Sequence, residues 1–325
     1  MSLRNRKPKA FKTKSAVRRL WTGKILVLYM GASMAMSTLC YGACVTDQLG
    51  RRVDVKKNVQ RVVALAPSIT EIVFALGQGH RVCGVTRFSN YPPEVQTVPR
   101  LGSYIHPDLE KIVALRPDLC IAVKDGNPRE IALSLESLHI PVYAVNPTDL
   151  ETVMETILDI GELLHSMDEA LALVQDMRMR IRTVKERVAR IGHRPDVFFQ
   201  IGISPIVSVG SDTFAHELID IAGGRNLSEG ATAYPRFSME QVIGLAPDVL
   251  IITSMARGRD FERVKSQWSL WPELPAVKSG RIAVVNSDLF DRPTPRLIDG
   301  LELLSALIHP ELVEDASESS GKPLR

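Results

Sequence analysis

The chain has 325 residues, of which 45% are hydrophobic and 24% charged, a composition typical of a globular protein long enough for two domains. Its formal net charge of +3 is unevenly distributed, because residues 1–24 hold nine basic residues and no acidic one. Without residues 1–43, 31 basic residues face 37 acidic ones, a net charge of −6. This acidic remainder argues against nucleic acid as a partner.

The first 43 residues have the pattern of a secretory signal. The basic stretch is followed by an uncharged run of nineteen apolar or small residues, Ile25 to Ala43. We therefore predict a signal peptide over residues 1–43 and a periplasmic location. A retained membrane anchor and a nucleic-acid-binding arm are the alternatives. The stretch "YGAC", Tyr41 to Cys44, is similar to a lipoprotein box, so lipid attachment at Cys44 is a further alternative.

Short apolar segments then alternate with helical ones. "RVVALAP", "RVCGVT", "DLCIAV" and "PVYAV" predict four buried strands between residues 61 and 145. In the first helix, Ser68 is expected as N-cap, with Glu71 at the capping-box position. Strands separated by helices predict a parallel sheet covered on both faces.

A long helix is predicted after this region. Apolar residues recur at helical spacing from about Met167 to Ile191, enough for roughly 37 Å of helix, with a coiled coil as the alternative. The strand and helix alternation then restarts. The predicted fold class is α/β, with two lobes, each a mostly parallel sheet flanked by helices, joined by one long rigid α-helix. The predicted segments are the signal peptide 1–43, an N-terminal lobe 44–160, the interlobe helix 161–192, a C-terminal lobe 193–312 and a disordered tail 313–325.

Two of the four cysteines belong to predicted strands. Cys83 and Cys120 lie in apolar runs, while Cys40 and Cys44 lie at the end of the signal segment. Export permits a disulfide, but two buried free thiols fit the mid-strand positions better. The cysteine spacings match no zinc motif.

One helix-to-strand unit occurs twice. "HPDLEKIVALRPDLCIAV" begins at His106, and "FSMEQVIGLAPDVLIIT" begins at Phe237. In register, Glu110 matches Glu240, each in the first turn of a predicted helix. A single such glutamate is explained by the helix dipole. A matched pair in two lobes predicts two anionic points that dock a pseudo-symmetric basic partner.

These phrases resemble a known family. "RVVALAPSITEIVFALG", "LEKIVALRPDLCIA" and "AVKSGRIAVVNSD" are similar to segments of the substrate-binding proteins of ABC importers whose lobes are joined by one rigid helix, the class III periplasmic-binding-protein fold. The resemblance covers residues 52–312. "SNYPP", "DGNPREIALSLESLHIPV", "VFFQIGISP" and "NSDLFDRPTPRL" resemble the vitamin B12-binding branch more than the siderophore binders.

The resemblance implies a binding site between the lobes for cobalamin or a related corrinoid. The residues expected to form it are Pro67, Phe88, Tyr91, Tyr104, Tyr234, Asp288, Phe290 and Arg292. Phe88 stands where this branch has Tyr, Tyr104 and Tyr234 stand where it has Trp, and Val123 replaces another Trp. Asp288 and Arg292 match an acid and a base that face the ligand, with an exposed i, i+4 ion pair as the alternative.

The resemblance also implies the partners. Glu110 and Glu240 match glutamates that contact arginines of a membrane permease dimer, and the protein is expected to be a monomer. No cofactor, catalytic residue or metal site is expected. The alternative ligands are a ferric siderophore or haem, for which Arg87, Arg236 and Arg292 are the available basic residues. A bare-metal receptor is disfavoured by seven scattered histidines, and an enzyme by the lack of any catalytic motif.

Overall fold

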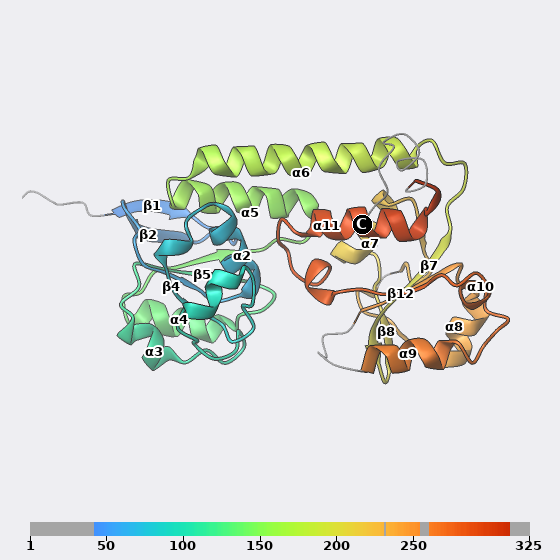
Figure 1. Ribbon diagram of the computed structural model, residues 1–325. Helices are drawn as coiled ribbons and strands as arrows, with labels where there is room; N and C mark the ends of the chain where they lie inside the picture. Colours follow the sequence, from blue (N-terminus) through green and yellow to red (C-terminus); the bar gives the residue numbers. More distant parts are fainter. Residues whose placement is uncertain (1–41, 231, 254–259, 313–325) are drawn as a thin grey trace, which may run out of the picture. The chain divides into compact units, whose positions relative to one another are not determined.

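The computed structural model describes residues 42–230, 232–253 and 260–312 (Figure 1). The described residues from Cys44 onward group into one compact unit. Residues 1–41 of the predicted signal peptide and the whole predicted tail lie outside the described residues. Among the helices that are described, none combines the length and apolar character needed to cross a membrane.

The N-terminal lobe is built on a four-stranded parallel sheet in the order β4-β3-β5-β6. Its strands are β3 (Val62–Ala64), β4 (Val82–Val85), β5 (Leu119–Val123) and β6 (Val142–Val145). Every residue of β3, β5 and β6 is buried, which explains the continuous apolar runs in the sequence. The predicted strands and their parallel pairing are therefore confirmed. A separate two-stranded sheet pairs β1 (Gly42–Thr46) with β2 (Arg52–Lys56).

Helices cover both faces of this sheet. Ile69 and Ile72 of α2 (Pro67–Ala75) and Leu150 of α5 (Leu150–Leu163) share one hydrophobic cluster with alternate strand residues. Ile112 of α3 (Leu109–Ala114) and Leu135 of α4 (Arg129–Ser137) pack on the opposite face. Side chains that alternate in direction along a strand produce this division. Two short 3-10 helices, η1 (Gly79–Arg81) and η2 (Pro93–Thr97), follow α2 and β4.

The long helix α6 runs from Met167 to Val188. Its 22 residues correspond to about 33 Å. Acidic residues in its first turn and basic residues in its last complement the helix dipole. The predicted segment 161–192 differs at its start, because residues 161–163 are the last turn of α5. Gly161 permits the tight packing of α5 on α6, since a Cβ there would lie 2.6 Å from Ala170 Cβ.

The C-terminal lobe has a six-stranded mixed sheet, in which β10-β8-β7-β11-β12 form a path and β9 also pairs with β7. The pairings β7–β9, β7–β11 and β11–β12 are parallel, and β7–β8 and β8–β10 are antiparallel. The strands are β7 (Asp196–Ile203), β8 (Ile206–Ser208), β9 (Arg225–Asn226), β10 (Arg236–Phe237), β11 (Val249–Ile252) and β12 (Ile282–Val284).

The helices of this lobe also divide between two faces. α7 (Phe214–Ile221) and α11 (Leu297–Ile308) share the large cluster that contains α5 and α6. α8 (Met239–Leu245), α9 (Asp260–Trp268) and α10 (Pro275–Lys278) pack on the other face through Val242, Trp268 and Ala276. A 3-10 helix, η3 (Ser287–Leu289), follows β12.

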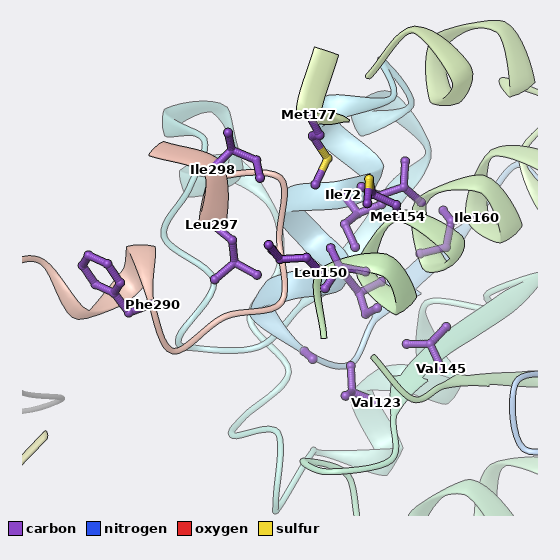
Figure 2. Packing of buried hydrophobic residues seen from close by; sticks show 14 of the residues in the cluster. Ile72, Val123, Val145, Leu150, Met154, Ile160, Met177, Phe290, Leu297 and Ile298 are labelled. Carbon is purple, nitrogen blue, oxygen red and sulfur yellow. The ribbon is translucent and has the colours of Figure 1, made fainter. Parts of the chain in front are cut away.

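One continuous apolar cluster joins the two lobes. Leu150 and Met154 of α5, Met177 of α6 and Leu297 of α11 all belong to it (Figure 2). A hydrogen bond crosses the same boundary, because the backbone N–H of Leu150 donates to Glu217 Oε2 of α7 at 2.9 Å. The long helix is thus one part of a larger interlobe core.

The strand order shows whether Cys83 and Cys120 are close enough to form a disulfide. Cys83 lies on β4 and Cys120 on β5, with β3 between them, and the structure gives Cys44, Cys83 and Cys120 as free. Strands on either side of a third are about 9.5 Å apart, beyond disulfide reach.

We therefore expect both thiols to react with a maleimide reagent in denaturant without any reductant. Peptide mapping by mass spectrometry will give the modified positions. A disulfide-linked peptide containing Cys83 and Cys120 would contradict the strand order.

Candidate functional site

Glu71 has a different role from the one predicted. The helix α2 begins at Pro67 with Ala66 as its N-cap, and no side chain caps it. The capping-box pattern of Ser68 and Glu71 is therefore wrong, because the helix starts two residues earlier than that pattern requires. Glu71 is 4% exposed and points its carboxylate to two arginines from the C-terminal lobe.

Arg292 of the C-terminal lobe connects the two lobes by hydrogen bonds to three residues of the N-terminal lobe. Its Nη1 donates to Glu71 Oε1 at 2.8 Å and to Asn90 Oδ1 at 2.7 Å. Its Nη2 donates to the carbonyl oxygen of Phe88 at 3.3 Å and pairs with Asp288 Oδ1 at 2.8 Å. Asn90 closes the ring by donating from Nδ2 to Asp288 Oδ2 at 2.9 Å. We call Glu71, Asn90, Asp288, Arg292 and Arg296 the interlobe polar cluster.

Arg296, the N-cap of α11, completes this cluster four residues further along the chain. Its Nε lies 3.4 Å from Glu71 Oε2, and its guanidinium lies over the ring of Tyr91, 4.1 Å from the ring centroid. Burial raises the pKa of Glu71, and the hydrogen bond from Arg292 and the charges of both arginines oppose this shift. The charges of Arg292 and Arg296 thus offset part of the cost of burying the Glu71 carboxylate between the lobes.

Aromatic side chains from the N-terminal lobe lie beside the cluster. The rings of Phe88 and Tyr104 are 5.6 Å apart and tilted by 57°, and Arg87 lies 4.7 Å from the centroid of Phe88. Phe88 is 36% exposed and Tyr91 43% exposed. These loops follow parallel strands, where ligands of open α/β sheets bind. Exposed aromatic rings at such a position provide flat apolar contact area.

Hydrogen bonds from polar side chains hold these loops. Asn127 donates to the carbonyl oxygens of Leu65 and Tyr104, and its Oδ1 accepts from the backbone N–H of Val123 at 2.8 Å. Ser89 Oγ lies 3.0 Å from Thr70 Oγ1. Loops tied to strand ends in this way present their aromatic side chains in fixed positions.

The C-terminal lobe contributes a tyrosine with acidic neighbours. Tyr234 is 59% exposed, and desolvation followed by the charges of Asp291 and Asp125 raises the pKa of its hydroxyl. Desolvation and the charge of Asp288 raise the pKa of Asp291 to about 6. The surroundings of Tyr234 therefore disfavour negative charge.

Three further positions are clear in the structure. Pro67 is the first residue of α2 and is half-buried. Phe290, labelled in Figure 2, is 2% exposed. Its ring packs edge-on against that of Phe199, with the centroids 5.4 Å apart. Val123, at the end of β5, is 7% exposed. Phe290 thus belongs to the core of the C-terminal lobe and offers no ring surface to a ligand in this structure.

The repeated glutamates occupy matching positions. Glu110 and Glu240 are each the second residue of a helix, α3 and α8, and both are exposed. Asp108 caps α3, and Ser238 forms a capping box with Gln241 on α8. Both helices cover the sheet face opposite the cluster that contains α6. Within each lobe, the glutamate therefore lies on the side away from the long helix.

Sequence reasoning missed three members of the interlobe polar cluster: Glu71, Asn90 and Arg296. Glu71 and Arg292 are 221 residues apart, so no local spacing connects them. The available signal was an apolar helix, α2, with a single acidic residue among buried neighbours. A buried carboxylate requires a cationic partner, which the sequence pattern alone does not identify.

A family comparison decides the class of the protein. The model of a family described as periplasmic binding protein matches residues 62–289. The chain belongs to the periplasmic binding protein family. The predicted class of fold is confirmed, and the family is one of binding proteins with an extracytoplasmic location.

Curated relatives of this periplasmic binding protein include a vitamin B12-binding protein of Vibrio parahaemolyticus, serotype O3:K6. The two are 31% identical over 245 residues, 75% of this chain and 87% of the relative. An uncharacterized ABC transporter substrate-binding lipoprotein of Bacillus subtilis, strain 168, is 30% identical over 284 residues. That match covers 86% of this chain and 89% of the relative.

Solved structures with the same fold bind different ligands. The crystal structure of a periplasmic vitamin B12 binding protein of Vibrio cholerae has a TM-score of 0.67 and 27% identity, covering 78% of this chain and 97% of that one. A periplasmic heme-binding protein of Roseiflexus sp. RS-1, in apo form, has a TM-score of 0.70 and 26% identity, covering 78% and 100%. The fold alone therefore does not select the ligand.

Proposed function

We propose that this periplasmic binding protein captures cobalamin or a related corrinoid between its lobes and delivers it to an ABC permease in the membrane. The observation that carries the proposal is a group of three aromatic rings, Phe88, Tyr91 and Tyr104, in the connection that follows the parallel strand β4. Phe88 and Tyr91 are exposed and Tyr104 is half-buried. A corrin ring is broad and flat, so it needs apolar walls of this kind. The identity with vitamin B12-binding relatives supports the same ligand.

Electrostatics favours a corrinoid over an anionic ferric complex. Such a complex calls for several convergent basic residues. Arg292 is instead paired with Glu71 and Asp288, and Arg87 lies over the ring of Phe88. Asp125 and Asp291 add negative charge near Tyr234. Cyanocobalamin carries no net charge and therefore avoids repulsion by these acids.

Haem is the second candidate. Tyrosine is one of the side chains that ligate haem iron, and Tyr91 and Tyr234 are both exposed. The raised pKa of Tyr234 disfavours the phenolate that would bind iron. Coordination of haem iron by Tyr234 is therefore disfavoured, and haem is a weaker candidate than a corrinoid.

The ligand is tested by fluorescence-quench titration of the purified protein with cyanocobalamin, haemin and a ferric siderophore in parallel. We expect saturable quenching by cyanocobalamin at micromolar concentrations or below and weaker responses to the other two. Saturation by haemin or the siderophore, with none by cyanocobalamin, would reject the corrinoid assignment and leave the family assignment intact.

Docking on the permease is proposed to use Glu110 and Glu240. Charge-assisted contacts of this kind contribute about 1.5–3 kcal/mol each. Glu110→Ala combined with Glu240→Ala is expected to leave ligand affinity unchanged and to reduce ligand uptake by reconstituted importer vesicles. The matched control is Glu130→Ala combined with Glu151→Ala, which also removes two exposed helix first-turn charges. Uptake by the Glu110 and Glu240 double variant at the wild-type rate would contradict the docking role.

The location is proposed to be the periplasm, reached through the N-terminal signal, with lipid attachment at Cys44 as the alternative. Mass spectrometry of the protein from its native membrane fraction will distinguish the two forms, because a lipidated Cys44 adds the mass of its acyl chains.

A further inference from the structure

A cluster of metal-binding side chains lies at the opposite end of α11 from the interlobe polar cluster. One oxygen of Glu311 and one ring nitrogen each of His193 and His309 lie within 4.8 Å of one another. His193 lies in the connection between α6 and β7, and His309 is the C-cap of α11. The two histidines are 116 residues apart in the sequence, so spacing at i, i+3 or i+4 could not reveal them.

The surroundings of His309 fix which nitrogen faces the cluster. The ring is fully buried, and its Nε2 lies 3.3 Å from the carbonyl oxygen of Gly223. A carbonyl oxygen only accepts, so Nε2 must carry the proton and donate it. In the neutral ring this leaves the lone pair on Nδ1, which lies 3.2 Å from Glu311 Oε1. Metal-binding histidines are commonly oriented by such a second-nitrogen hydrogen bond.

The lone pair of Nδ1 and the carboxylate oxygen face each other as two acceptors. They become compatible when His309 takes a second proton or when a cation binds both. The distance of 3.2 Å is close to the separation of about 3.3 Å between two ligands of a tetrahedral zinc ion. His193 Nε2 lies 3.9 Å from the same oxygen, and its side chain is 65% exposed, so it can rotate to complete a three-ligand set.

The fold places this cluster where three helices end. Val188 is the last residue of α6, Gly223 follows α7, and His309 caps α11. They are in close contact, since a Cβ on Gly223 would lie 2.4 Å from Val188 Cγ1 and 2.7 Å from His309 Nε2. Helix C-termini carry partial negative charge and favour a cation. Arg281 already binds the carbonyl oxygens of Leu307 and Ile308, so the side chains must supply the metal ligands.

We propose that His193, His309 and Glu311 bind a divalent transition-metal ion of the zinc class, with a water molecule in the fourth position. Two imidazoles and one carboxylate are a donor set that zinc accepts in tetrahedral geometry. The ion joins the end of α6 to the end of α11. It is a resident ion of the C-terminal lobe and is separate from the transported ligand.

Isothermal titration of the metal-stripped protein with zinc sulfate tests the site. We expect one zinc ion per chain, with affinity reduced at least about tenfold by His193→Ala and by Glu311→Gln, since even outer-sphere changes cost that much. His106→Ala, which alters an exposed histidine of the N-terminal lobe, is the matched control and should bind as the wild type does.

A second measurement distinguishes metal binding from a folding defect. Zinc should raise the Tm of the wild type and leave that of His193→Ala unchanged, while the metal-free forms melt alike because His193 is exposed. Absence of binding at micromolar zinc, or equal affinity in the His193 and Glu311 variants, would overturn the site. The contact between His309 and Glu311 would then be an ion pair of a doubly protonated imidazole.

Discussion

Replacing Glu71 with alanine is expected to lower the free energy of unfolding by about 3–5 kcal/mol, the usual cost of removing one partner of a buried ion pair. The side chain of Glu71 is 2% exposed, and those of Arg292 and Arg296 are 12% and 15% exposed. Without the carboxylate, two guanidinium groups remain close together with little water to solvate them. Urea unfolding followed by circular dichroism will measure the loss.

Two variants make this experiment specific. Glu151→Ala removes a glutamate that pairs with Arg178, but both side chains are more than half exposed, so we expect about 0–1 kcal/mol. Glu71→Gln keeps the size of the side chain and an acceptor for Arg292. It therefore separates the effect of losing the charge from the effect of losing side-chain volume. If Glu71→Ala costs no more than Glu151→Ala, the interlobe polar cluster does not stabilise the fold.

Phe290→Ala is expected to lower the free energy of unfolding by about 3–5 kcal/mol, because removing a buried aromatic ring leaves a cavity in the core. The ring packs on Phe199, and Gly300 allows it to approach α11, since a Cβ there would lie 3.0 Å from Phe290 Cε1. At a temperature where the variant remains folded, its affinity for cyanocobalamin should equal that of the wild type.

Phe88→Ala provides the matched contrast, because its ring is 36% exposed and that of Phe290 is 2% exposed. We expect Phe88→Ala to change stability by less than about 1 kcal/mol and to weaken corrinoid binding. The two phenylalanine variants therefore separate a core position from a wall of the binding site. Loss of affinity in a folded Phe290→Ala protein would return Phe290 to the ligand-binding set.

The pattern of strands and helices was predictable, because continuous apolar runs such as β5 and the helical repeat of α6 are local signals. The caps at Asp108 and Ser238 were predictable for the same reason. The mixed pairing of β8 and β10 in the C-terminal sheet was not, because strands of two or three residues leave little periodicity to detect.

The site was only partly predictable. Family resemblance gave Asp288 and Arg292, but their partners Glu71 and Asn90 lie about 200 positions away in the chain. The pattern at Glu71 also fitted a capping box, a local interaction that the buried ion pair replaces. Phe290 shares its turn with Asp288, yet its ring is directed into the core, and the spacing of residues does not reveal direction within a 3-10 turn.

The apolar cluster shared by α5, α6, α7 and α11 has a consequence for cooperativity. Neither lobe can lose its share of these four helices without exposing apolar surface that packs against the other lobe. Melting of one half on its own is therefore costly, and heating should produce a single calorimetric transition for residues 44–312. An extracytoplasmic binding protein gains from this coupling, because partly unfolded forms that proteases attack are rarely populated.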